Sequence, residues 1–285
     1  MPSLIDIRRR IRSVKNTQQI TKAMKMVSAA KLRRAQDRVI AARPYGAMLR
    51  KMLANVAAAA SRDENAGQNP LLAQRPEQRV LLVLVTSDKG LAGAFNSNLI
   101  KAAQRFGVDR AGVTVTFELI GRKGRDFFRK RRARISGDQL NPAKPNYQET
   151  AAIARKAMDL YAKEEIDAVY LVYNEFKSVV AQKLVVTRVL PAEMPEGAES
   201  IDYLYEQPPA EMLGSLLPRY VETEFFRALL ESTAAEHAAR MTAMDAATSN
   251  AADMIEKLTL HMNRVRQASI TKEIIEVVSG AAAAE

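Results

Sequence analysis

The stretch that decides the fold is residues 234–265, AAEHAARMTAMDAATSNAADMIEKLTLHMNRV. Side chains along it stand alternately three and four residues apart without a slip: Ala234, His237, Met241, Met244, Thr248, Ala251, Ile255, Leu258, Met262 and Val265. This spacing puts them on one narrow side of an α-helix and is typical of a coiled-coil seam. After Pro218 there is no proline, and the only glycine is Gly280. The sequence therefore predicts a C-terminal helix over residues 208–285, about 90 Å of it unbroken.

The N-terminal segment carries a similar stripe. Residues 3–43 contain no glycine and no proline, which permits a helix of about 60 Å. Apolar residues keep the same spacing in two groups, Leu4, Ile7, Ile11 and Val14, then Leu32, Ala35, Val39 and Ala42. Between the groups, Ile20, Met24 and Val27 indicate a shifted register, with Gln18 and Thr21 where apolar residues would be expected.

Two residues are expected to disturb this N-terminal helix. Pro44 and Gly46 predict a kink or an interruption, because proline removes a helical hydrogen bond. The helical pattern resumes through Leu49, Leu53 and Val56. We expect the N-terminal helix over residues 1–60 and an exposed polar linker over residues 61–78.

A narrow apolar stripe on so long a helix cannot be buried by the helix itself. Both ends of the chain carry one, so we expect them to pack on each other, antiparallel. Each large apolar side chain buried there contributes roughly 1.5–3 kcal/mol. The fold class predicted is a long antiparallel coiled coil of the N- and C-terminal helices with an inserted domain.

The inserted domain, residues 79–205, alternates strands and helices. A continuous apolar run, typical of a buried strand, lies at Val80–Thr86, and Val113–Ile120 and Ala168–Tyr173 look similar. Val179–Leu190 alternates like an antiparallel edge strand. Helical stretches lie at Asn98–Phe106, Lys123–Arg132 and Gln148–Lys163. This order predicts a small α/β (Rossmann-like) domain with a partly parallel sheet.

The positive charge of the chain is concentrated at one end. The formal net charge is +11, yet residues 1–62 hold fifteen Lys or Arg against Asp6 and Asp37, and the remainder is nearly balanced. Nucleic acid, anionic lipid or an acidic protein surface could each be the partner. An Arg-rich, acid-poor N-terminus is also typical of a mitochondrial transit peptide.

Signals for catalysis are weak. The chain has no cysteine, and its two histidines, His237 and His261, show no metal-ligand spacing. Residues 87–93, SDKGLAG, follow a predicted strand where phosphate loops occur, but lack the nucleotide-binding spacings. We interpret them as a tight turn whose glycines allow close backbone approach. We therefore expect no catalytic site, no cofactor and no metal, and no apolar run is long enough to span a bilayer.

The C-terminal tip is unusual. Residues 270–281, ITKEIIEVVSGA, carry apolar side chains all round the helix. A helix of this kind is expected to be surrounded. Since the N-terminal helix has only just begun at this end, another protein is the expected surrounding.

Four blocks of sequence resemble the gamma subunit of the F-type ATP synthase, of the bacterial type. They are residues 5–36 with NTQQITKAM at 16–24, TSDKGLAGAFN at 86–96, EHAARMTAMDAATSN at 236–250, and RQASITKEIIEVVSGA at 266–281. Ala92 stands where the family often has cysteine, and the linker looks longer than in many members. Because the resemblance begins by Ile5, it argues against a transit peptide.

This resemblance implies a non-catalytic rotor shaft in an enzyme complex, the proton-transporting two-sector ATPase. The implied partners are the alpha and beta subunits of the catalytic hexamer, the epsilon subunit and the membrane c-ring, without nucleic acid or bilayer insertion. The implied location is peripheral, on the cytoplasmic face of the bacterial inner membrane. The shaft would present a different face to each beta subunit as it turns.

The resemblance also implies contact residues. Those facing the beta subunits are Lys22, Met24, Lys25, Lys31, Arg266, Gln267 and Thr271. A tip within an apolar sleeve would use Ile270, Ile274, Val277 and Val278. A foot near the epsilon subunit and the membrane ring would use Tyr203, Tyr205 and Glu206.

Two other classes remain open from the residues alone. A basic coiled-coil protein that binds nucleic acid would explain the charge but not the apolar tip, and its binding would weaken steeply with salt. An enzyme built on residues 79–205 would require turnover by that part alone.

Overall fold

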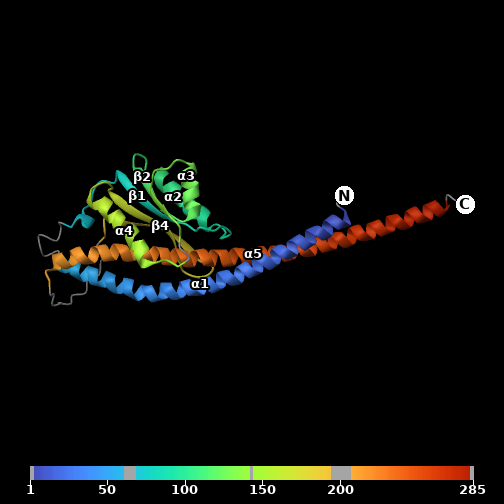
Figure 1. Cartoon of the computed structure of the whole chain (residues 1–285), viewed down its shortest axis with the longest axis horizontal. Coiled ribbons are helices and arrows are strands. Elements are labelled where there is room, and N and C mark those ends of the chain that lie inside the picture. The colour runs from blue at the N-terminus through green and yellow to red at the C-terminus, as the bar shows by residue number, and fades with distance from the viewer. Residues whose placement is uncertain (1–2, 61–68, 142–143, 194–206, 283–285) are drawn as a thin grey trace. The chain divides into compact units, whose positions relative to one another are not determined.

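The computed structural model describes residues 3–60, 69–141, 144–193 and 207–282 (Figure 1). The chain divides into two compact units. The first unit contains residues 1–28 and 241–285, and the second contains residues 29–240. Two helices, α1 (Leu4–Ala60) and α5 (Pro209–Ala282), contribute to both units. Among the described residues, no helix has the length and apolar character needed to cross a membrane.

In the first unit, α1 and α5 pack as an antiparallel pair. The Thr248 hydroxyl donates to Thr21 Oγ1 at 2.8 Å, and Lys25 Nζ lies 2.5 Å from Asp245 Oδ1. Residue numbers rise along one helix as they fall along the other, which confirms the predicted orientation. The predicted seam positions from Met241 to Val265 are all buried or half-buried. The seam predicted for α5 is therefore confirmed.

The predicted shift of register in α1 is wrong. The packed side of α1 in the first unit keeps a single alternation of three and four, through Leu4, Ile7, Ile11, Val14, Gln18, Thr21, Lys25 and Ser28. Ile20 and Val27 instead are 60% and 55% exposed. The alternation through Gln18 and Thr21 continues the same packed side, so the two apolar groups need no change of register between them. Polar side chains therefore occupy the seam, and Thr21 is satisfied by hydrogen bonds to Gln18 and Thr248.

Helix α1 is not interrupted at Pro44, contrary to one of the two outcomes expected there. In the second unit its packed side continues through Leu32, Ala35, Val39, Ala42, Gly46, Leu49, Leu53, Val56 and Ala60. Proline within a helix costs about 3 kcal/mol. Burial of several large apolar side chains on both sides of Pro44 offsets that cost.

The α/β part of the second unit has a five-stranded sheet in the order β3-β2-β1-β4-β5. Its strands are β1 (Arg79–Val85), β2 (Thr114–Ile120), β3 (Ile135–Gln139), β4 (Ala168–Phe176) and β5 (Gln182–Leu190). Strand β1 pairs in parallel with β2 and β4, β2 pairs in parallel with β3, and β5 runs antiparallel to β4. The partly parallel sheet and the antiparallel edge strand are confirmed.

Helices cover both faces of this sheet (Figure 1). They are α2 (Phe95–Val108), α3 (Arg122–Lys130) and α4 (Tyr147–Ala162), and a short 3-10 turn, η2 (Pro70–Leu72), precedes β1. Leu81, Val83 and Val85 of β1 join a core with α4, with Leu53 of α1 and with Phe225 of α5. The remaining residues of β1 after Arg79 are also buried, as predicted for a strand covered on both faces. Within this unit, α1 and α5 are therefore part of the layer that covers the sheet.

Strand β3 was not predicted. Its sequence, ISGDQ, contains glycine and aspartate, which disfavour strands, and its residues are only half-buried or exposed. It lies at the edge of the sheet, where pairing with β2 alone supports it. Tertiary pairing, not local propensity, forms this strand.

Candidate functional site

The basic residues of α1 in the first unit are mostly unpaired. Arg8, Arg10, Arg12, Lys15 and Lys22 are exposed, and none forms an ion pair with another described residue. Neighbouring like charges repel one another, so a cluster without acidic partners costs free energy in the isolated chain. The positive field of this face is therefore available to a partner of opposite charge.

The residues expected at the beta contact have different environments in the structure. Lys22 is exposed and Met24 is half-buried. Lys25 is paired with Asp245 across the seam, so part of its charge is compensated within the chain. Lys31, which belongs to the second unit, is exposed, and its charge helps to lower the pKa of His237.

Exposed apolar side chains on the outside of α1 were not recognised from the sequence as a surface. Ile20, Met26 and Val27 are each more than half exposed. The signal was present, because continuing the alternation of three and four through Gln18 and Thr21 places all three residues off the seam. Exposed apolar side chains beside unpaired lysines are suited to a partner that is amphipathic and acidic.

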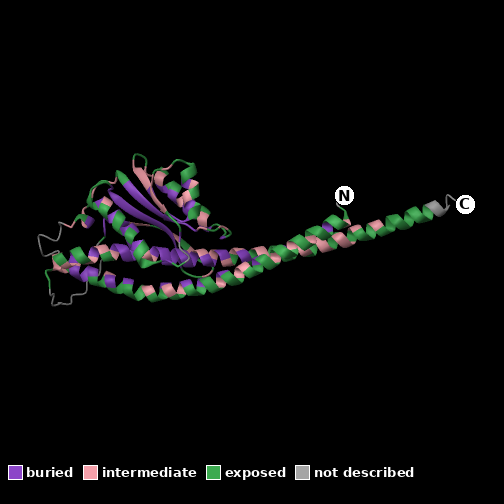
Figure 2. Cartoon of the chain, viewed as in Figure 1, coloured by how far each residue is buried: buried purple, intermediate pink, exposed green. Residues whose placement is uncertain are grey.

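The end of α5 has no partner helix within its unit. Thr21 faces Thr248 and Lys25 faces Asp245, so the first residue of α1, Leu4, falls opposite the region of Val265. Beyond it, residues 271–279 are all exposed (Figure 2). The tip residues Ile270, Ile274, Val277 and Val278 are between 48% and 72% exposed. These four apolar side chains therefore lie exposed on a part of α5 that has no partner helix within its unit.

Arg266, Gln267 and Thr271 lie where this bare segment begins. The Thr271 hydroxyl donates to the Gln267 carbonyl of its own helix at 2.9 Å. The side chains of Arg266 and Gln267 are exposed and make no hydrogen bond or ion pair with another described residue. Their hydrogen-bonding groups are free for an external partner. The expected foot residues, Tyr203, Tyr205 and Glu206, lie outside the described residues.

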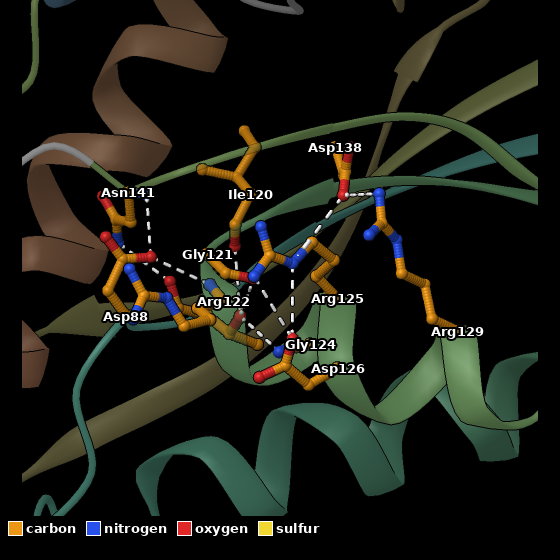
Figure 3. Close-up of polar contacts among 11 residues, drawn as sticks. Asp88, Ile120, Gly121, Arg122, Gly124, Arg125, Asp126, Arg129, Asp138 and Asn141 are labelled. Atoms are coloured by element: carbon orange, nitrogen blue, oxygen red, sulfur yellow. Dashed lines mark hydrogen bonds and ion pairs between the residues drawn. The ribbon is translucent and has the colours of Figure 1, made fainter.

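The polar side chains of the turn at residues 86–96 bond to other groups of the same chain, and Figure 3 shows the contacts of Asp88. The Asp88 carboxylate accepts the backbone N–H of Arg122 at 2.8 Å, at the N-terminus of α3, and that of Asn141 at 3.2 Å. The Ser87 hydroxyl and Asn96 side chain bond to each other. An acidic side chain thus occupies the position at the start of α3 that would favour an anion. The arrangement fits the structural turn that we expected here.

The reason given for the glycines of this turn needs correction. A Cβ at Gly90 would meet only the Lys123 side chain, at 3.8 Å, so close backbone approach does not require glycine there. Gly93 has φ of 55°, a left-handed conformation that favours glycine. The close approach occurs at Gly121, where a Cβ would collide with the backbone of Thr86.

Two of the blocks that carry the family resemblance meet in the second unit. Arg240 of α5 donates from Nη2 to the carbonyls of Lys89 and Gly90 at 3.2 and 3.3 Å. Its Nη1 lies 2.8 Å from Glu236 Oε1, in a pair that is nearly buried. The α5 helix is thereby bonded directly to the backbone of the turn after β1.

Burial governs the ionisation of the groups around Arg240. Burial raises the pKa of Glu236, and the nearby Arg240 opposes that shift. Burial, together with the charges of Arg240 and Lys31, lowers the pKa of His237 to about 4. His237 is therefore neutral at physiological pH. It acts as a buried polar residue of the seam and not as a charged contact.

Comparison with known proteins gives one family. A family model described as ATP synthase matches residues 3–284. The ATP synthase gamma chain of Solibacter usitatus is 74% identical over 286 residues, covering 100% of both chains. A mitochondrial ATP synthase central stalk and c-ring structure from Tetrahymena thermophila contains a chain with 25% identity and a TM-score of 0.59, covering 80% of this chain and 99% of that one.

A second solved structure agrees on the fold. A chain of the Euglena gracilis mitochondrial ATP synthase, in an assembly of OSCP, F1 and c-ring, matches with a TM-score of 0.68 at 20% identity. That match covers 98% of this chain and 94% of the other. Because the family model and the bacterial relative both span nearly the whole sequence, this chain belongs to the family of ATP synthase gamma chains.

Proposed function

We propose that this chain is the central rotor shaft of a proton-translocating ATP synthase, with no catalytic site of its own. Rotation of a membrane c-ring would turn the chain within a hexamer of alpha and beta subunits. Family membership supports a role in that complex, and the solved relatives come from structures of the rotor or of F1 with the c-ring. That the chain couples the c-ring to the hexamer by rotating is our own proposal.

The observation that carries the proposal is the bare end of α5. An isolated helix without packing is marginal in water, and this one also exposes isoleucine and valine. Burying one such side chain contributes roughly 1.5–3 kcal/mol. A sleeve of apolar side chains from the surrounding hexamer would bury this segment and still allow it to turn.

The basic face of α1 would make the second contact with the hexamer. Lys22, Met24 and Lys31 would face acidic segments of the beta subunits, with Ile20 and Val27 adding apolar contact in the same region of sequence. Arg266, Gln267 and Thr271 would bond to a loop of beta. A shaft that presents unequal faces shifts each beta subunit toward a different conformation, since a ligand shifts populations only by binding states unequally.

The remaining assignments concern the other end of the complex. We propose that residues 79–205, with Tyr203, Tyr205 and Glu206, contact the epsilon subunit and the c-ring. The chain would then lie peripherally on the cytoplasmic face of a bacterial inner membrane. Residues 1–60 and 208–285 would form the shaft, joined to residues 79–205 through the linker 61–78.

The test is binding to the catalytic subunits. Changing Ile274→Asp and Val277→Asp places two charges on the bare segment, where they break no contact within the chain. We expect the variant to fold normally, by circular dichroism and thermal unfolding, but to fail to co-elute with purified alpha and beta subunits.

The matched control changes two exposed valines elsewhere, Val108→Asp and Val180→Asp, which are 78% and 87% exposed. This control should co-elute as the wild type does. Normal co-elution of the Ile274 and Val277 variant would contradict the proposal that this tip enters the hexamer.

A further inference from the structure

The sheet has a position at which its fold ordinarily binds a ligand. In open parallel sheets, ligands bind outside the carboxyl ends of the strands where the strand order reverses. In the order β3-β2-β1-β4-β5, that point lies between β1 and β4. Here the carboxyl end of β4 and the turn that follows β1 are both bonded to α5 of the same chain.

At the end of β4, the contact is a buried carboxylate. Glu231 is 2% exposed, and its Oε2 accepts the backbone N–H of Phe176, the last residue of β4, at 3.1 Å. Its Oε1 accepts from Arg43 Nη2 of α1 at 3.2 Å. Arg43 Nη2 also reaches the Phe176 carbonyl at 3.5 Å. Both helices are thus bonded to the end of β4.

At the end of β1, the contact is a guanidinium. Arg240 donates from Nε and Nη2 to the carbonyl of Gly90 and from Nη2 to that of Lys89, all within 3.3 Å. Glu236 compensates its charge from one turn earlier on α5. The turn itself is fixed to α3 by Asp88, so it is a firm attachment point.

The two anchors lie on opposite sides of α5. Nine residues separate Glu231 from Arg240, which corresponds to two and a half helical turns, or about 13 Å of rise. Rolling of α5 about its axis in either sense would therefore stretch one set of bonds. Apolar packing around Phe225 and Leu229 already buries one side of α5. The two sets of hydrogen bonds define its rotational setting more narrowly, because hydrogen bonds are directional.

We propose that α5 takes the place of a ligand at the switch point of this sheet, and that Glu231 and Arg240 are positioning residues that lock its rotational setting. The lock is a property of the second unit alone. Its consequence for ATP synthase rests on the proposed function, in which torque must pass between the α/β part and α5 without slip.

The first experiment uses the full chain alone and so is independent of the proposed function. Because the chain has no cysteine, spin labels can be attached to Val108→Cys on α2 and Arg219→Cys on α5 without background. We expect a narrow distance distribution between the labels in the otherwise unchanged chain. With Glu231→Gln and Arg240→Gln together, we expect a broadened or shifted distribution.

The matched control is an ion pair between a half-exposed arginine and a buried carboxylate, at the amino ends of the same two strands. Asp167 accepts from Arg79 at the amino end of β1, at 2.8 Å, and is nearly buried. Asp167→Asn should lower stability but leave the distance distribution narrow. A narrow, unshifted distribution in the folded double variant would overturn the lock.

A milder change keeps the idea testable if the double variant does not fold. Arg240→Lys keeps the charge but lacks the planar fork by which Nε and Nη2 reach the turn carbonyls while Nη1 pairs with Glu236. It should broaden the distribution, whereas Glu231→Gln, which can still accept from Phe176, should broaden it less. Equal, unbroadened distributions in both single variants would overturn the lock.

The second experiment uses the assembled complex in membrane vesicles. Arg240→Lys should lower the number of protons pumped per ATP hydrolysed severalfold, with the hydrolysis rate nearly unchanged. The reason is that ATP hydrolysis would continue while part of the torque on α5 fails to reach the α/β part. A purely structural role would lower both together, and that result would overturn the positioning role. If the unchanged chain itself supports no coupled pumping, the proposed function fails, and the spin-label result still decides the lock.

Discussion

His237 gives the chain a defined response to pH at the residue scale. Its pKa is about 4 in the folded chain, against an ordinary value of 6.5. Between these two values the unfolded chain binds a proton that the folded chain does not, so stability falls as pH falls through this window. The shift corresponds to about 3 kcal/mol at the acid end.

We therefore predict that His237→Gln flattens the stability profile between pH 6.5 and about 4. Urea unfolding of both chains at several pH values measures this difference directly. Glu236, Arg240 and Lys31 remain in both chains, so their contributions cancel in the comparison. Parallel profiles for the two chains would show that His237 does not titrate as stated.

Arg266 and Gln267 provide a second prediction at this scale. Their side chains are exposed and form no hydrogen bond or ion pair with another described residue, so changing both to alanine should leave the melting temperature of the isolated chain within about 1–2 °C. ATP hydrolysis by the assembled complex should fall severalfold, because both residues are proposed to bond to beta. Asn263→Ala and Ser269→Ala, on the half-buried side, serve as the comparison. Unchanged turnover would count against the contact.

The lysines of α1 are not equivalent, which gives a third prediction. Reversing Lys22 and Lys31 to glutamate should weaken binding to the alpha and beta subunits more at low salt than at high salt. Reversing Lys22 alone should leave the stability of the isolated chain unchanged, because Lys22 is exposed and forms no ion pair with another described residue. Reversing Lys31 should lower it, because the charge of Lys31 favours the ionised form of the nearly buried Glu236. Lys25→Glu should also destabilise the first unit, by facing Asp245 with a like charge. If none of the three changes weakens binding to the alpha and beta subunits, the positive charge of α1 is only a solvated surface.

The polar stretch of the seam is the notable feature at the scale of the helices. Coiled coils use occasional polar seam residues to fix register at a cost in stability. Here Gln18, Thr21, Lys25 and Ser28 follow one another in α1, and Thr21 bonds Thr248 of α5. Over this length the first unit therefore buries less apolar surface, and its polar seam residues specify the register of the two helices.

Replacing Thr21 and Thr248 together by valine should stabilise the first unit by about 1 kcal/mol, because removing both partners leaves no buried polar group unsatisfied. Hydrogen exchange of amides in residues 14–28 measures this locally. Thr259→Val, whose hydroxyl bonds only its own helix, is the control and should have little effect. A large loss of protection in the double variant would mean that the threonine pair is a main source of stability.

Sequence periodicity predicted the long helices and most of the sheet because each rests on runs of regular spacing. It failed where context overrides local pattern. Ile20 and Val27 were placed on a shifted stripe, since a single helix cannot show from sequence which of two apolar strips its partner covers. Strand β3 was not predicted, because pairing with β2 and not its own sequence forms it. The anchors Glu231 and Arg240 had no sequence signal, because their partners are backbone atoms far along the chain.

For the whole molecule, the bare end of α5 predicts a contrast between the free and assembled chain. Amides of residues 271–279 should exchange within seconds in the isolated chain, far faster than those of residues 244–258 in the seam. In the complex with alpha and beta subunits they should become strongly protected. Slow exchange in the isolated chain would mean that the segment already has a partner within the chain.

The strict alternation of three and four in the first unit also has a mechanical consequence. It repeats every 3.5 residues, slightly short of the roughly 3.6 per turn of a straight helix, so the pair must wind left-handed to keep its contacts aligned. A wound pair is chiral, and twisting it one way tightens the coil while twisting it the other way opens it. The resistance of this pair of helices to twisting therefore differs between the two directions, whatever applies the load.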